Sequence, residues 1–331
     1  MRKGTWIVAC VLLVCIALPA LAQNQLAGLL RDELALGLTP TLKSAGMGGA
    51  YVGVDNPLSM NPASLSSVDF FQVMGTYGLY DSDDGPTAHR GRADFIYPVP
   101  YIGGNSRLMI DGLTSDGSDM SRLGAPLEYD GLTLGSQYGR NITDWFAVGF
   151  GGYPYEKASV DMHTPGGTVK SEALSQLGSI QLGALFRPHD KVRLGVEYIY
   201  IKDDLETWLP GPAHMGDYFY IHYVAVGISA TPFDGTLVAL DYWNGEIEGD
   251  VSPGVAFDVD VDRWNFGVQQ RVCDFCDLRV GSNNGGFTTG FTIHIQENLD
   301  FDYAYINKAL RDKENVLGDT QYHGVALTYR F

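Results

Sequence analysis

The chain has 331 residues, and its 39 acidic residues outnumber its 22 basic residues, which gives a formal net charge of −17. A protein this acidic repels the phosphate backbone of nucleic acids, so nucleic acid is excluded as a partner. Four cysteines are too few for a disulfide-stapled scaffold of this length.

Residues 1–22 have the parts of a secretory signal peptide. Two basic residues open the chain, an apolar run covers Trp6–Leu18, and Ala20-Leu21-Ala22 supplies the small residues of a cleavage site. The apolar run is shorter than the ~20 residues that a membrane-spanning helix needs. We therefore expect cleavage by an ordinary signal peptidase and a mature chain that begins at Gln23.

The stretch from Ser44 to Leu65 is apolar but cannot be regular. Its glycines allow the backbone to approach other groups closely, and its prolines remove backbone donors, so neither a good helix nor a central strand fits. Because the stretch is too apolar for a solvated linker, it needs surrounding walls. A short helix is expected before it, within Gln23–Gly37, and we predict that residues 23–68 form a compact plug. The residues expected to give the plug flexibility or to fix its turn against the wall are Gly46, Gly48, Gly49, Asn61, Pro62 and Ala63.

From residue 69 onward, apolar and polar residues alternate with a period of two. In Asn298–Ile306, an apolar face of leucine, phenylalanine and tyrosine opposes Asp300 and Asp302. Fourteen such segments can be found, and most approach the ~9–11 residues of a tilted membrane-spanning strand. A soluble β-sandwich with one buried face would show the same alternation.

The lengths of the connections favour a barrel over a sandwich. Long connections such as Pro154–Leu177 and Asn244–Asp262 alternate with short ones such as Pro188–Asp190, and Asn283-Asn284-Gly285 is the exception. Outer-membrane barrels have short periplasmic turns and long external loops, whereas a sandwich has no reason to sort loop lengths in this way. We therefore predict an all-β fold in the bacterial outer membrane. It is an antiparallel transmembrane β-barrel of about 14 strands over residues 69–331, with the plug inside its lumen.

The last predicted strand ends in an aromatic residue, and its apolar side chains share one face. It resembles the C-terminal assembly signal of bacterial outer-membrane proteins, which implies that the barrel-assembly machinery is a partner. The residues assigned to this signal are Gly324, Leu327, Tyr329 and Phe331.

Two motifs in the plug resemble a known family. Gly46-Met47-Gly48-Gly49-Ala50, followed by an Asp-Asn spacer and then by Asn61-Pro62-Ala63-Ser64-Leu65, is similar to the N-terminal hatch of the FadL/TodX outer-membrane transport family. The resemblance extends to PorV, a relative used in type IX secretion. It implies that hydrophobic molecules enter from outside, pass a binding cavity and leave past the plug. The chain is short for the fatty-acid transporters and lacks the long helical insertions of their external loops.

These observations give one leading hypothesis and two alternatives. The leading one is passive uptake of hydrophobic small molecules, such as long-chain fatty acids or hydrocarbons, past the plug. A PorV-like scaffold that binds secretion-system proteins is the first alternative, and a structural barrel or general porin is the second. In each case the barrel would contact outer-membrane lipid and lipopolysaccharide.

The remaining candidate sites have plain structural interpretations. Cys273-Asp274-Phe275-Cys276 falls on a predicted periplasmic turn, where a disulfide that clamps the hairpin is favoured over a redox or metal site, because neither a βαβ context nor further ligands lie nearby. No local motif for a catalytic nucleophile accompanies the seven histidines, so we predict no enzymatic activity, no cofactor and no metal. Acidic residues that could bind Ca²⁺ but are favoured as solvated loop residues are Asp81, Asp83, Asp84, Glu246, Glu248, Asp250, Asp258, Asp260 and Asp262.

Overall fold

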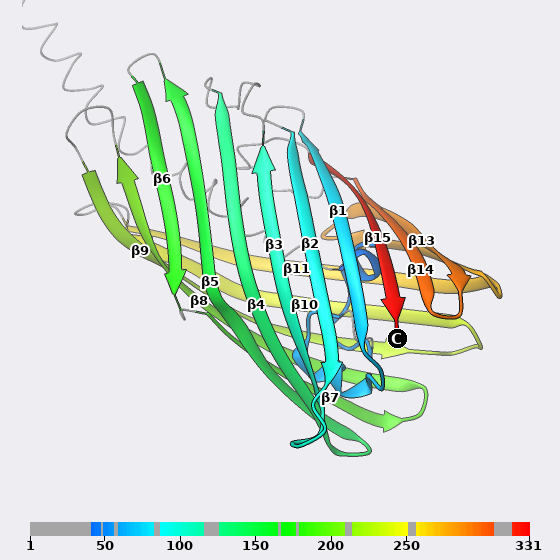
Figure 1. Cartoon of the computed structure of the whole chain (residues 1–331). Helices are drawn as coiled ribbons and strands as arrows, with labels where there is room; N and C mark the ends of the chain where they lie inside the picture. The colour runs from blue at the N-terminus through cyan, green and yellow to red at the C-terminus, as the bar shows by residue number, and fades with distance from the viewer. Residues whose placement is uncertain are drawn as a thin grey trace, which may run out of the picture.

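The computed structural model describes residues 41–47, 49–55, 59–82, 87–115, 126–164, 167–176, 179–208, 214–250, 256–307 and 320–331 (Figure 1). The signal peptide, the helix expected within Gln23–Gly37, and Gly48 lie outside these residues. The first predicted segment carries a short helix, α2 (Leu42–Gly46), and a 3-10 helix, η1 (Pro62–Ser67). The strands are β1 (Gln72–Ser82), β2 (Ala88–Pro98), β3 (Asn105–Ser115), β4 (Leu127–Thr143), β5 (Phe146–Thr164), β6 (Gly167–Gln176), β7 (Ser179–His189), β8 (Val192–Trp208), β9 (His214–Ala230), β10 (Thr236–Asp250), β11 (Ala256–Cys273), β12 (Cys276–Asn283), β13 (Gly286–Gln296), β14 (Leu299–Ile306) and β15 (Thr320–Arg330).

The strands form one closed antiparallel barrel. Strands that follow each other in sequence pair with each other, except for β6 and β7, and β1 also pairs with β15 from Gln72↔Arg330 to Ser82↔Thr320. β5 pairs with β7 through residues 146–151 and with β6 through residues 155–164, so β6 and β7 occupy one place between β5 and β8. The fifteen strand segments therefore fill fourteen places, as the sequence predicts. In the described part of the chain, every strand is paired with a strand on each side, so the β-sandwich alternative is wrong.

The wall is apolar outside and polar inside. Outward side chains such as Phe150, Leu182 and Ile228 are 59%, 48% and 44% exposed, whereas inward Gln181 and Asp241 are fully buried. This inverted arrangement is characteristic of barrels that face lipid. Among the described residues, no helix is both long and apolar enough to cross a membrane.

Strand ends are where the sequence prediction was wrong. β6 lies within the predicted loop Pro154–Leu177, and most of the predicted loop Asn244–Asp262 is paired strand in β10 and β11. The acidic residues expected there on a loop instead face each other across the ladder, as in Glu246↔Asp260 and Glu248↔Asp258. β6 carries polar residues on both faces, which removes the period-two signal. Residues 256–262 of β11 do alternate between apolar and polar, so there the predicted strand began too late.

The segment Thr41–Val68, which we call the N-terminal segment, lies inside the ring of strands (Figure 1). α2 packs on β12 to β15, and η1 packs on β3, β4, β5 and β7. The segment was predicted to contain no good helix, and its two helices are indeed only 5 and 6 residues long. η1 begins at Pro62 because proline needs no backbone donor there, and the Asn61 side chain caps it by accepting a bond from Ala63 N–H at 3.0 Å.

Candidate functional site

The inner wall meets the N-terminal segment at a row of glycines. Gly139, Gly149 and Gly183 are direct neighbours across β4, β5 and β7. A Cβ on any of the three would collide with residues Asn61–Ala63 of the N-terminal segment. The absence of side chains here lets two backbones touch, which is the usual reason for glycine in a strand interior.

The same arrangement continues on the neighbouring strands of the wall. Gly195 of β8 is paired with Gly227 of β9, and a Cβ on either would collide with Val52 or Gly53. Gly267 of β11 lies in the same way against Met47. We call these six wall residues the glycine belt: Gly139, Gly149, Gly183, Gly195, Gly227 and Gly267.

Asn61 joins the N-terminal segment to itself and to the wall. Its side-chain N–H group donates to the carbonyl oxygen of Val52 at 2.9 Å and to those of Ala184 and Val196 in the wall at 3.3 and 3.5 Å. Its side-chain oxygen caps η1, so the buried amide uses both its donor and its acceptor. A buried amide satisfied in this way fixes one geometry, because any displacement leaves polar atoms without partners.

Amide and guanidinium side chains of the wall bind the carbonyl oxygens that precede Asn61. Gln137 and Gln181 both donate to the Met60 carbonyl oxygen at 3.0 Å. The Nη1 atom of Arg107 donates to the Ser59 carbonyl oxygen at 3.0 Å, while its Nε atom pairs with Asp94 at 2.8 Å. The irregular backbone of the segment thus finds its partners on the wall, as buried backbone must.

Ionic contacts hold two further points of the segment. Arg187 of β7 pairs with Asp55 at 2.7 Å and donates to the Ser66 hydroxyl at 2.9 Å. At the other end, Lys43 of α2 approaches Asp300 of β14 at 3.5 Å. These pairs tie the segment to strands that are far apart around the barrel.

An aromatic cluster lies where the Tyr51 loop meets the wall. The ring of Tyr51 packs edge-on against Trp243 at 5.3 Å, and the ring of Tyr223 stacks on the same Trp243 at 5.3 Å. Burial, and the nearby Glu197 carboxyl group, raise the pKa of the Tyr51 hydroxyl well above its usual value, so it remains a neutral donor. The cluster offers stacking surfaces at the inner wall.

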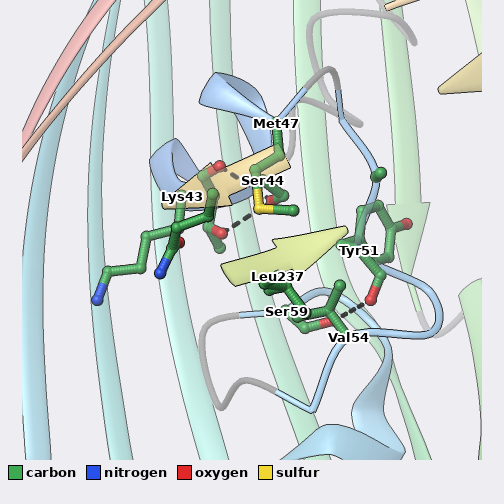
Figure 2. Close-up of a pocket in the computed structure, with 10 residues that line it drawn as sticks. Lys43, Ser44, Met47, Tyr51, Val54, Ser59 and Leu237 are labelled. Atoms are coloured by element: carbon green, nitrogen blue, oxygen red, sulfur yellow. Dashed lines mark hydrogen bonds between the residues drawn. The ribbon is translucent and has the colours of Figure 1, made fainter. Parts of the chain in front are cut away.

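A small crevice separates the N-terminal segment from β10 and β11. Figure 2 shows Lys43, Ser44, Met47, Tyr51 and Val54 around it, with Leu237 on the wall side. Its volume of about 20 Å³ has room for about one water molecule. This space is too small for a hydrophobic ligand.

The structure brings together most of the predicted plug residues. Gly46 lies against Gly290 of the wall, and a Cβ there would be 3.2 Å from the Gly290 Cα atom. Gly49 has φ +81°, a backbone conformation that favours glycine. Asn61, Pro62 and Ala63 are fully buried or nearly so against the glycine belt.

The other predicted residues lie apart from this interface. Cys273 and Cys276 face each other across the β11–β12 turn and are free thiols in the structure. Leu327, Tyr329 and Phe331 point outward and are 53%, 39% and 71% exposed, whereas Gly324 faces inward against Leu42. They are not part of the internal site.

Sequence reasoning missed the wall side of the interface. The glycine belt, Asn61's carbonyl partners and Asp241, whose carboxylate binds the Tyr51 loop, were not singled out. Glycine at an inward strand position is a usable signal, but it becomes readable only when the barrel fixes which face is inward.

Comparison with known proteins adds the fold relationship. No family model matches the chain, and no curated protein matches it in sequence. Among solved structures, the Ralstonia pickettii toluene transporter TbuX matches with a TM-score of 0.59 and 16% identity, over 87% of this chain and 97% of that one. The monoaromatic hydrocarbon channel CymD matches with a TM-score of 0.58 and 15% identity, over 88% and 99% of the two chains.

The chain has the fold of FadL/TodX-type channels. A FadL homologue of Pseudomonas aeruginosa also matches, with a TM-score of 0.55 and 13% identity over 88% of this chain and 98% of that one. At these identities the likeness establishes the FadL-like barrel architecture that the plug motifs indicated.

Proposed function

We propose that this protein is an outer-membrane channel for passive uptake of hydrophobic small molecules and that its N-terminal segment is the gate. The observation that carries the proposal is the glycine belt, where the segment's backbone rests directly on the inner wall. The FadL-like fold supports a transport role, since the similar solved structures are described as a toluene transporter and a hydrocarbon channel. A signal peptide over residues 1–22 would deliver the chain to the outer membrane.

Hydrogen bonds and ion pairs hold the segment in this proposal, and each can be exchanged for bonds to water. Asn61, Gln137, Gln181 and Arg187 contribute polar contacts whose net free energies are small, about 0.5–1.5 kcal/mol for a neutral bond. A gate built this way can leave the wall without breaking a covalent bond. Flux then follows the concentration gradient of the hydrophobic ligand.

Deletion of residues 23–65 tests the proposal. The strand ladders begin at Gln72, so the barrel should still form, as a mobility shift between unboiled and boiled samples would report. In planar bilayers the shortened protein should conduct ions at a level the full chain does not reach, and cells carrying it should admit small polar antibiotics.

A second readout separates uptake from secretion. Uptake of a fluorescent fatty acid and of an aromatic hydrocarbon should lose its discrimination in the shortened protein. If the shortened barrel is assembled, sealed and normal in uptake, the gate proposal fails. Normal uptake together with lost secretion of partner proteins would instead support the PorV-like scaffold.

A further inference from the structure

Asp241 of β10 binds the N-terminal segment through a carboxylate. Its Oδ2 accepts hydrogen bonds from the backbone N–H groups of Tyr51 at 2.6 Å and Val52 at 2.8 Å, and the Gly53 N–H group faces the same carboxylate. The Asp241 side chain is fully buried. Successive backbone N–H groups that converge in this way form a small anion-binding concavity. The loop therefore holds Asp241 as it would hold a bound anion.

Gly227 makes this contact possible. It lies directly opposite Asp241 on β9, and a Cβ at Gly227 would be 2.2 Å from the Asp241 Oδ1 atom, which is too close for both to be present. The same Cβ would be 2.7 Å from the Gly53 nitrogen. The carboxylate can lean over β9 toward the loop only because the facing residue has no side chain.

The contact made by Asp241 differs in chemistry from the other contacts that hold the segment. Asn61, Gln137 and Gln181 bind through neutral amides, and Asp55 is paired with Arg187. The described partners of the Asp241 carboxylate are instead the backbone N–H groups of Tyr51, Val52 and Gly53. Bonds to an ionised acceptor are about twice as strong as neutral ones, so the strength of this attachment depends on the negative charge of the carboxylate.

We propose that Asp241 is the positioning residue that keeps the Tyr51–Gly53 loop closed, and that its negative charge is what the loop binds. The inference rests on the proposed gate and names the attachment that controls it. Removal of the charge should free this loop while the amide contacts around Asn61 persist. The protein should then open in part rather than lose its whole N-terminal segment.

Protonation of the carboxylate removes the same charge, so acid should favour opening. The titratable groups around Asp241 are Tyr51 on the loop, Glu197 on β8 and Tyr223 on β9, and Arg263 of β11 acts on Tyr223. Glu197 is a second carboxyl group at the same interface, bonded to Gln181. The variant Glu197→Gln is therefore needed to assign any acid response to one of the two.

The test is single-channel conductance of the full-length protein as a function of pH. Wild type should be mostly closed at pH 8 and should open as the pH falls. Asp241→Asn should be about tenfold more often open at pH 8, because two charge-assisted bonds are lost, and should respond little to acid. Glu197→Gln should keep the acid response. Asp111→Asn is the matched control, since that carboxylate is bonded to Arg90 of a neighbouring strand.

Two further measurements decide the remaining outcomes. Gly227→Ala keeps the carboxylate but removes the space into which it leans, so this variant should also open at pH 8. The second measurement is the acid titration of wild type, which needs no variant. If Asp241→Asn and Gly227→Ala are assembled and stay closed while the deletion of residues 23–65 conducts, the role of Asp241 is wrong and the gate stands. If the deletion stays sealed as well, the gate proposal itself is wrong. An acid response that Glu197→Gln abolishes and Asp241→Asn retains would also overturn the assignment.

Discussion

At the residue scale, the interface depends on wall glycines, which have no side chain, as much as on side chains that form hydrogen bonds. Asn61 could be predicted from the sequence, because an asparagine before a proline in an apolar stretch fixes a turn. Its wall partners could not, because Gly139, Gly149 and Gly183 are far apart in sequence and meet only through strand register. The role of Asp241 could not be predicted from the sequence either, since an aspartate in a strand gives no sign that backbone N–H groups approach it.

Gly195 provides a direct test of this close packing. A Cβ at Gly195 would fall on the Val52 carbonyl oxygen, so Gly195→Ala should push the loop off the wall and raise basal conductance several-fold. Gly91→Ala is the matched control, because a Cβ there meets nothing within 4 Å. The measurement is conductance of the assembled protein together with proteolysis of the N-terminal segment. Equal conductance in the two alanine variants would show that the glycine belt has no part in closing the barrel.

At the element scale, the sequence predicts strands well where they cross lipid and poorly beyond it. β14 was predicted within one residue of its observed start, because apolar outward and polar inward residues alternate along all of it. β6 was missed, since Gly167–Gln176 is mostly polar on both faces. The Asn284-Gly285 turn has φ of 45° and 83°, which suits a tight two-residue hairpin and explains the one short connection that broke the predicted loop pattern.

The β11–β12 hairpin carries the two cysteines that are predicted to form a disulfide. Cys273 and Cys276 are opposite each other, and the tip is also held by a bond from the His294 N–H group to the Phe275 carbonyl oxygen at 2.9 Å. We expect both thiols to be oxidised in the periplasm, as a polyethylene-glycol maleimide would show by reacting only after reduction. Replacement of both with serine should leave transport nearly unchanged, because closing so short a ring constrains the unfolded chain less than closing a long one. Lost transport at normal barrel levels would instead favour a redox or metal role.

At the scale of the whole molecule, one end of the barrel is marked by exposed aromatic rings. Tyr101, Trp145, Phe233 and Phe275 are 98%, 57%, 73% and 62% exposed, and each belongs to a different short turn. Phe331, 71% exposed, joins them from the C-terminus. Aromatic rings gather at membrane–water boundaries, so this end is expected to mark the periplasmic boundary. The polar strand ends that the sequence analysis mistook for loops then extend from the opposite boundary.

Phe331 allows assembly to be separated from stability. Its backbone N–H donates to the Phe71 carbonyl oxygen at 2.9 Å, and the two rings lie 5.0 Å apart, so it completes the β1–β15 seam. The seam ladder from Gln72 to Ser82 remains without it, and an aromatic pair contributes only about 0.5–1.5 kcal/mol beyond its buried area. Deletion of Phe331 should therefore leave barrel refolded in detergent almost as stable as wild type. Its level in the outer membrane should nevertheless fall sharply, because a terminal aromatic residue is what the assembly machinery is expected to recognise.

Phe233→Ala is the matched control for that deletion, since it removes an exposed ring at the same end of the barrel without altering the terminal strand. Outer-membrane levels by immunoblot and unfolding of the refolded barrels in denaturant are the two measurements. Normal membrane levels after loss of Phe331 would remove the assembly role. A refolded barrel destabilised by far more than one aromatic contact would show that the residue acts through the seam, because a signal read only during assembly cannot change the stability of a barrel that folded without the machinery.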